Sequence, residues 1–432
     1  MTWKIRAEWD RLKKVAVHTP GIEMFFGLLD PFASLYERAF SQRDALREHE
    51  LLQYTLKHDF KVDVLPLKDT IIDLSLKKPS LKRELIDLAR KSMVFNGDEM
   101  EVEQARQEME ANSNIMDPEH YFNTILLNPS LELEPRMTTR QINLHITQRE
   151  PLTNLYFMRD QQVVTDKGMV LSRMSKPQRE REPILTKLLW DMLKEPPIHE
   201  IQDPATFEGG DYMPLDQFAL LGIGDRTNLN GVEQMLQHAL GFDEVGVVHQ
   251  PNHPLIPPDK SDPMLNMHLD NYFNVVSKEV ALGSKTLLET AQVDIYQKSG
   301  EGYQKSSETM NLYQYITSKG YELINITTLE QMAYAANFLC IKDGTVLALE
   351  VERIVKDVME KLKFKARRDP DRYLKLFQEI RKDYRKLRQE GQFFPHKKEI
   401  YQHDIEAYPL NLANLTGGYG GAHCMTCPLR RT

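Results

Sequence analysis

Short apolar segments rich in β-branched residues recur along the chain, each bounded by turn-forming residues. The clearest are KVAVHTPG at 14–21, KVDVLPL at 61–67, QVVTDKGMVLS at 162–172 and EVGVVHQ at 244–250. Such segments are typical of β-strands. The Asp-Lys-Gly turn within 162–172 and the Asp-Gly turn within FLCIKDGTVLALE at 338–350 predict hairpins. Amphipathic stretches such as 31–58 have helical spacing, so the pattern predicts an α/β or α+β fold with mixed sheets.

Two longer segments, 68–145 and 353–400, are polar, follow helical spacing and contain few strand candidates. In the first, LKRELIDLARKSM and EMEVEQARQEMEA read as helices of a small bundle. The second has a basic face opposite an apolar stripe formed by Tyr373, Leu376, Phe377, Ile380, Tyr384 and Leu387. A helix packed on the domain is the favoured interpretation, because aromatic residues at this spacing form a core first. An RNA-binding helix at 371–390 is the alternative.

Composition is that of an ordinary globular protein, with 41% hydrophobic and 27% charged residues. The net charge of −8 favours neither nucleic-acid nor membrane partners. No apolar segment approaches the roughly 20 residues of a membrane span, and the N-terminus lacks a signal-like apolar core. We therefore expect a cytoplasmic protein. The cysteines Cys340, Cys424 and Cys427 are expected to be free thiols, and a single Cys-x-x-Cys pair cannot complete a four-ligand metal site.

Four polar clusters carry the candidate chemistry. They are Phe157-Met158-Arg159-Asp160, Glu208-Gly209-Gly210-Asp211, His268-Leu269-Asp270 and Gly420-Gly421-Ala422-His423-Cys424-Met425-Thr426. Each lies at the end of an apolar strand-like run, where loops can direct side chains into a shared site. Their intervals suggest a unit repeated around an axis. Singly, an aspartate can cap a turn and a histidine can be structural, but together in this order the motifs are specific.

In these motifs the chain resembles the arginine deiminases of the guanidine-modifying superfamily. The resemblance extends from LKKVAVHTPG and EHELLQYTLKHDFKVDVL near the N-terminus to MTCPLRR near the C-terminus. It implies a five-bladed pseudo-symmetric α/β propeller of ββαβ-type repeats around a central site. The catalytic domain would comprise 1–67 and 146–432, with an inserted helical domain at 68–145. Segment 353–400 would be an additional helical insertion, about which the resemblance says nothing.

The resemblance implies hydrolysis of free L-arginine to L-citrulline and ammonia through a covalent Cys-amidino (thiouronium) intermediate, with no cofactor or metal. A guanidinium resists attack because it is resonance-stabilised, so it needs a fork of carboxylates and a strong nucleophile. The family's positions match Asp160 and Asp270 as the fork and Cys424 as the nucleophile. His268 would move protons, and Glu208 would orient it. These carboxylates should raise the pKa of the empty enzyme's thiol, and the bound cation should lower it.

Free arginine also carries an α-carboxylate, which an arginine-specific site should bind with cations. The family's carboxylate-binding arginines match Arg179 and Arg226, and Asn154 matches a further substrate-contacting position. Asp211 is expected to support the site. Tyr419 stands where the family usually has an arginine five residues before the nucleophile. Its hydroxyl can hydrogen-bond a carboxylate but brings no charge.

Other functions remain to be distinguished. Within the superfamily, a deiminase or amidinotransferase could act on another guanidino compound. Citrulline plus ammonia as products would indicate deimination, and transfer to an amine without ammonia would indicate an amidinotransferase. An arginine-binding sensor would need no nucleophile, so the intact set around Cys424 speaks against it. We expect a small-molecule guanidino substrate, a homo-oligomer, and no membrane or nucleic-acid partner.

Overall fold

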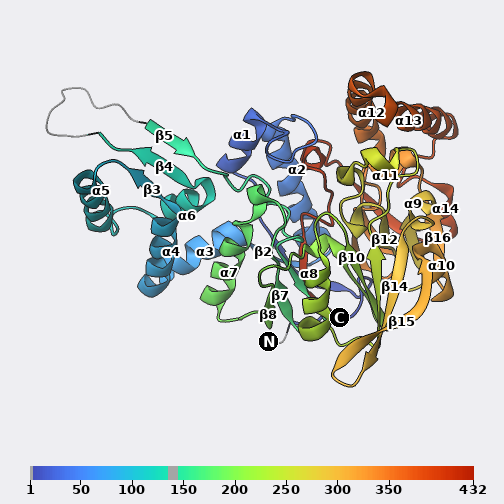
Figure 1. Ribbon diagram of the computed structural model, residues 1–432, viewed down its shortest axis with the longest axis horizontal. Helices are drawn as coiled ribbons and strands as arrows, with labels where there is room; N and C mark the ends of the chain where they lie inside the picture. The colour runs from blue at the N-terminus through green and yellow to red at the C-terminus, as the bar shows by residue number, and fades with distance from the viewer. Residues whose placement is uncertain (1–2, 135–144) are drawn as a thin grey trace.

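The computed structural model describes residues 3–134 and 145–432 and combines helices with small sheets (Figure 1). Five sheets share one pattern, in which the middle strand pairs antiparallel with one neighbour and parallel with the sheet's next strand along the chain. They are β20–β1–β2 (Cys427–Arg431, Leu12–Val17, Asp63–Pro66), β6–β7–β8 (Gln162–Val164, Met169–Leu171, His199–Glu200), β9–β10–β11 (Tyr212–Leu215, Phe218–Ile223, Glu244–His249), β12–β13–β16 (Phe273–Val275, Val280–Gly283, Glu322–Asn325) and β17–β18–β19 (Leu339–Lys342, Thr345–Leu349, Glu406–Leu410).

Helices span the parallel connections, because parallel strands cannot be joined by a tight turn. They include α1 (Ile22–Leu29), α2 (Gln42–Tyr54), α7 (Glu182–Leu193), α8 (Leu229–Gln234), α9 (Lys285–Leu288) and α10 (Leu312–Ser318). The hairpin β14–β15 (Gln292–Ser299, Gly302–Asn311) extends the third sheet beyond β11. The fold is therefore α/β with small sheets, and no sheet formed by the described residues is closed.

The strand and hairpin predictions from the sequence are confirmed. Strands β6 and β7 form the predicted antiparallel hairpin in 162–172, and β17 and β18 form the one in 338–350. The helix expected over 31–58 begins only at Gln42, because the Ser41 side chain accepts a hydrogen bond from Asp44 N (3.2 Å) and caps the helix there. The residues before Ser41 form turns.

The described part of segment 68–145, residues 68–134 and 145, lies at one end of the long axis of the molecule (Figure 1). Its helices are α3 (Leu67–Lys77), α4 (Pro79–Ser92), α5 (Glu99–Ala111) and α6 (Pro118–Leu127). It also contains the three-stranded sheet β3–β4–β5 (Val94–Asn96, Pro129–Glu132, His145–Gln148), which the sequence did not predict. Strands of three or four residues are too short for a period-two pattern to stand out. Residues 135–144 of the expected domain lie outside the described residues.

Segment 353–400 contains α12 (Val351–Arg368), α13 (Pro370–Glu390) and α14 (Lys398–Gln402). Four members of the predicted stripe on α13 are buried: Tyr373, Leu376, Ile380 and Leu387. The helix packs on α12 and on α11 (Thr328–Met332), where Asp383 accepts a hydrogen bond from Leu329 N (3.1 Å). The stripe is thus part of the largest apolar core. None of the helices in the described ranges is long and apolar enough for a bilayer span.

Candidate active site

Each of the five repeated sheets contributes one loop to a common site, from the segment just before its outer antiparallel strand. The side chains come from Asp160 (before β6), Glu208 (before β9), His268 and Asp270 (before β12), Asn337 (before β17) and Cys424 (before β20). All of them are buried. The side chains of the candidate site therefore all come from equivalent loops, one in each of the five sheets.

Hydrogen bonds join these loops in sequence order and close into a ring. They are Gly209 N to Asp160 O (3.1 Å), Leu269 N to Asp211 Oδ1 (3.1 Å), Asn337 Nδ2 to Asp270 O (3.2 Å), His423 N to Asn337 O (3.1 Å) and Arg159 N to Cys424 O (3.0 Å). Backbone groups make most of these bonds, so the loops are held at fixed distances. We call this arrangement the loop ring.

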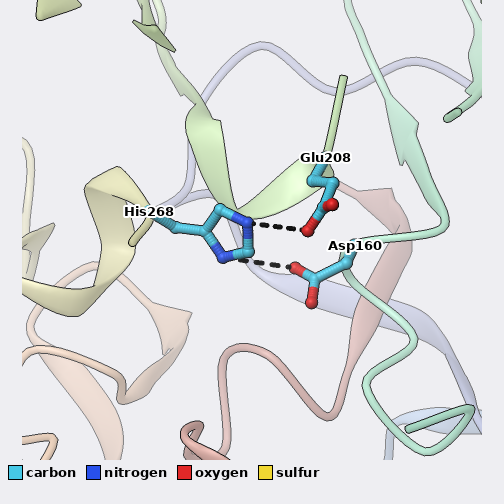
Figure 2. Close-up of side chains that lie close together, drawn as sticks. All are labelled: Asp160, Glu208 and His268. Atoms are coloured by element: carbon cyan, nitrogen blue, oxygen red, sulfur yellow. Dashed lines mark hydrogen bonds and ion pairs between the residues drawn. The ribbon is translucent and has the colours of Figure 1, made fainter. Parts of the chain in front are cut away.

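His268 lies between two carboxylates, as Figure 2 shows. Its Nε2 is 3.0 Å from Glu208 Oε2, and its Nδ1 is 3.8 Å from Asp160 Oδ1. Burial alone would lower the pKa of His268, but Asp160 and the hydrogen bond with Glu208 raise it to about 9. Burial opposes the charge of Glu208 too, yet Arg226 and His268 hold the pKa of that carboxyl well below its ordinary value. The pair is therefore charged at neutral pH, with His268 as a proton donor.

Cys424 is surrounded by groups that disfavour its thiolate. Its Sγ lies 3.4 Å from Asp270 Oδ2 and accepts a hydrogen bond from Asn337 Nδ2 (3.0 Å). Burial, together with the charges of Asp270 and Asp160, holds the pKa of the thiol well above its ordinary value. The direction of this shift matches the prediction from the sequence. A nucleophile in this setting needs a nearby positive charge to lose its proton.

Asp160 and Asp270 each keep one carboxylate oxygen without a hydrogen bond from the described residues, although Oδ1 of Asp160 forms the longer ion pair with His268 (3.8 Å). Oδ2 of Asp160 accepts a hydrogen bond from Arg179 Nη1 (2.8 Å), and Oδ2 of Asp270 lies 2.7 Å from His423 Nδ1. Burial opposes the charge of Asp270, but the bond with His423 holds the pKa of its carboxyl below the ordinary value. Oδ1 of each aspartate is buried and has no hydrogen-bond partner within the described ranges. Two strong acceptors thus remain for N–H donors beside Cys424.

Asn337 is a site residue that the sequence analysis missed. Besides its bond to Cys424 Sγ, its Oδ1 accepts hydrogen bonds from Gly421 N (2.7 Å) and Cys424 N (3.1 Å). It therefore fixes both the backbone and the sulfur of the nucleophile. Its position could have revealed it, because Asn337 stands two residues before β17 as Asp160 stands two residues before β6.

Arg179 is placed at the acidic end of the site. Its Nη1 donates to Asp160, while Nε and Nη2 donate to the Glu182 carboxylate (3.0 and 2.9 Å). Burial outweighs the attraction of Arg179 and raises the pKa of Glu182 to about 7. Glu182 was not predicted, and its role here is to orient Arg179.

Three further predicted residues, Asn154, Arg226 and Tyr419, line a narrow cavity of about 20 Å³, which is little more than the space of one water molecule. Its lining includes Asn154, Arg226, Tyr419, Met264 and Met267, together with the groups around Cys424. A guanidino compound can enter only if some of these side chains move. A wider surface hollow of about 650 Å³ beside Trp9 and Lys319 has no cysteine or histidine in its lining.

Asp211 does not line the cavity. Its Oδ2 accepts a hydrogen bond from Thr227 Oγ1 (2.7 Å), and its Oδ1 accepts the Leu269 N bond of the loop ring. Burial raises the pKa of Asp211 to about 6. Asp211 therefore connects loops behind the site.

Asp160, Glu208 and His268 could also hold a metal ion, since each offers one ligand atom and these atoms lie within 4.8 Å of one another. Two guanidinium groups already compensate their charge: Nη1 of Arg179 and of Arg226 lie 3.7 and 3.5 Å from Glu208 Oε2. A third cation would be repelled by both arginines. The arrangement fits proton transfer better than metal binding.

Comparisons with known proteins agree with this geometry. The family model for arginine deiminase matches residues 33–431. The arginine deiminase of Halobacterium salinarum is 26% identical, over 99% of this chain and 96% of that protein, and the one of Listeria monocytogenes is 25% identical over 65% of this chain and 62% of that protein.

Two solved structures resemble the fold. One is the ternary complex of AgrE with ornithine and NAD+ (TM-score 0.51, 13% identity, 97% of this chain and 39% of that chain). The other is the N-terminal domain of ArgZ, a cyanobacterial arginine dihydrolase (TM-score 0.50, 12% identity, 97% of both chains). At these identities the two structures bear on the fold alone.

Proposed function

The chain belongs to the arginine deiminase family and is an amidine C–N hydrolase, and from this premise we propose that it hydrolyses free L-arginine to L-citrulline and ammonia. The observation that carries the proposal is that the buried Oδ1 atoms of Asp160 and Asp270, near Cys424, accept no hydrogen bond from the described residues. A planar guanidinium supplies N–H donors to both oxygens and the positive charge that this acidic site lacks. Leaving such acceptors unsatisfied is costly, so the site favours a forked cation.

Substrate binding creates the nucleophile. The guanidinium charge offsets the carboxylates that hold the Cys424 thiol protonated, and the thiol gives its proton to solvent, where the departing ammonia later takes it up to become ammonium. The thiolate then attacks the guanidinium carbon and forms a C–S bond. Protonated His268 gives its proton to a terminal nitrogen, the C–N bond breaks, and ammonia departs from the Cys-amidino intermediate.

Water completes the cycle. His268, now neutral, takes a proton from water, and the resulting hydroxide attacks the amidino carbon. The C–S bond breaks, the hydroxyl proton of the collapsing intermediate passes to the departing sulfur, and citrulline leaves while Cys424 returns as a thiol. In total, one water molecule enters and one ammonium ion leaves. Glu208 holds His268 in place through the Nε2 contact and favours its charged form between turnovers.

The other end of the cavity is proposed to bind the α-carboxylate. Arg226 lies beside the cavity, and its Nε and Nη1 make no hydrogen bond to the residues that the structure describes but form longer ion pairs with Asp225 (3.4 Å) and Glu208 (3.5 Å). A guanidinium held only by such longer contacts suits a substrate carboxylate. Asn154 and Tyr419 add neutral donors, and Arg179 stays a predicted partner that must first leave Asp160.

We also propose that the five repeated sheets are the blades of a pseudo-symmetric propeller. The common strand pattern and the loop ring support this arrangement. In this proposal the catalytic domain comprises 1–67 and 146–432. Segment 68–145, whose sheet β3–β4–β5 stands outside the repeat, is an inserted domain, and 353–400 is an insertion between β18 and β19.

Product analysis tests the proposed reaction. Purified protein is incubated with arginine, agmatine and citrulline, and ammonia and citrulline are measured. We expect citrulline and ammonia from arginine, slower release of ammonia from agmatine, no turnover with Cys424→Ala, and near-normal turnover with the matched control Cys427→Ser. Turnover that survives Cys424→Ala contradicts the nucleophile. Preference for agmatine, or ammonia-free transfer to an added amine, would support another guanidino substrate or an amidinotransferase.

A further inference from the structure

Residues around the turn between α12 and α13 form hydrogen bonds with residues 261–262. This short segment directly precedes Met264 and Met267, which line the cavity. Oδ2 of Asp262 accepts hydrogen bonds from Tyr373 Oη (2.7 Å) and Lys365 Nζ (3.1 Å). Burial opposes the charge of Asp262, but Lys365 and Tyr373 hold the pKa of its carboxyl below the ordinary value. The carboxylate is therefore a charged anchor between the helical insertion and the catalytic domain.

Further contacts join the same two segments. Arg372 donates a hydrogen bond to the Ser261 carbonyl, and Lys260 Nζ lies 3.6 Å from the carboxylates of both Asp369 and Asp371. Each segment therefore supplies both a positive and a negative charge to this small contact. Exposed ion pairs contribute little singly, but these surround the partly buried anchor at Asp262.

The same carboxylate shapes the cavity wall. Oδ1 of Asp262 accepts a hydrogen bond from Met264 N (3.2 Å) and caps the 3-10 turn Pro263–Leu265. Met264 Sδ in turn accepts a bond from Arg226 Nη2 (3.6 Å), and Met267 also lines the cavity. One side chain therefore connects the insertion, through Oδ2, with the wall next to Arg226, through Oδ1.

We propose that the α12–α13 hairpin is a positioning element that fixes Met264 against Arg226 and so sets the length of guanidino compound that the cavity admits. This inference rests on the proposed function. The cavity of about 20 Å³ must open for substrate, and the wall between Asp262 and Met267 is tethered from outside by the hairpin. Gln250 Nε2 and Gln331 Nε2 also donate hydrogen bonds to this wall, at Pro263 O (3.0 Å) and Leu265 O (2.9 Å), so the wall keeps these contacts when the hairpin contact is weakened.

The test weakens the tether but keeps Asp262 and its cap on Met264. The double variant Tyr373→Phe/Lys365→Met removes both donors to Oδ2. The matched control, Tyr384→Phe/Lys375→Met, makes the same chemical changes on α13, where Tyr384 contacts only Arg388 among the hydrogen bonds described and Lys375 is exposed. Two readouts are used: the rate at which iodoacetamide alkylates Cys424 in the substrate-free protein, and kcat and KM for arginine and for homoarginine, which is one methylene longer.

We expect the double variant to be alkylated several-fold faster than the wild type, with KM for arginine raised about tenfold and kcat changed little. The ratio of kcat/KM for homoarginine to kcat/KM for arginine should rise by about threefold, because a more mobile wall excludes the longer substrate less strictly. The control should match the wild type. Alkylation and substrate ratios equal to those of the control would overturn the inference, as would a loss of kcat that follows a lowered unfolding temperature.

The alkylation readout separates this inference from the proposed function. If the wild-type protein does not convert arginine, the proposed function fails, yet faster alkylation of Cys424 in the double variant still supports the positioning role. If arginine is converted and alkylation is unchanged, the positioning role fails alone.

Discussion

The two ends of the cavity are built in different ways. At the acidic end, Asp160, His268 and Cys424 line the cavity, and together with Asp270 they come from the loop ring, where neighbouring loops fix each of them. At the other end, the wall consists of Arg226, Asn154, Tyr419 and the two methionines, and Asn154 is held by a hydrogen bond to the Ser34 carbonyl (2.8 Å). The comparison teaches that recognition of the guanidinium is preorganised, whereas recognition of the rest of the substrate depends on side chains that must move.

Neutralising the acidic end of the cavity should have the largest effect on activity. Asp160→Asn and Asp270→Asn should each lower kcat/KM for arginine by at least about a hundredfold, because each removes a charge-assisted contact to the guanidinium. The two variants should differ in the empty enzyme. The charge of Asp270, whose Oδ2 lies 3.4 Å from the sulfur, raises the thiol pKa more than that of Asp160, so Asp270→Asn should lower this pKa more, as read from the pH dependence of Cys424 alkylation. An unchanged thiol pKa in both variants would contradict the account of the nucleophile.

The pH dependence of kcat/KM tests the role of His268 at the acidic end. With a pKa of about 9, His268 is protonated at neutral pH and loses its proton as pH rises through that value. If the charged form is the required acid, kcat/KM should fall above about pH 9. Glu208→Gln removes one of the groups that raise this pKa, so the alkaline fall should move down by about one pH unit or more. A fall that stays in place in Glu208→Gln would assign it to another group.

A third experiment addresses the far end of the cavity. Arg226→Ala should lower kcat/KM for arginine about tenfold more than for agmatine, because agmatine has no α-carboxylate. Arg179→Ala should instead impair both substrates, since Arg179 holds Asp160. Parallel losses for both substrates in Arg226→Ala would remove Arg226 from carboxylate binding.

The smallest effect is expected at Tyr419, where the family usually has an arginine. Tyr419→Phe removes one neutral donor and should lower kcat/KM for arginine by about threefold, with agmatine unaffected. Steady-state assays with both substrates measure this directly. A large loss for both substrates would show that Tyr419 supports the wall and does not bind the carboxylate.

Local patterns predicted a good part of the structure. The hairpins with Asp-Gly turns and the stripe on α13 followed from periodicity and turn chemistry, and the structure brings together the five charged or nucleophilic residues expected at the site. Contacts between distant segments could not be predicted in the same way. Asn337 has no charge and no motif, and the pairing of Arg179 with Asp160 depends on which rotamer the tertiary environment selects. The strands β3–β5 were too short to show alternation.

The loop ring also has a consequence for how the enzyme acquires and loses activity. Each repeated sheet supplies one loop, so no part of the fold holds a working site by itself, and contacts of very long sequence separation must all be formed first. Opening any one sheet removes a member of the reacting set even if the other four stay intact. Catalysis is therefore a more stringent probe of complete folding than circular dichroism, and on renaturation it should return last.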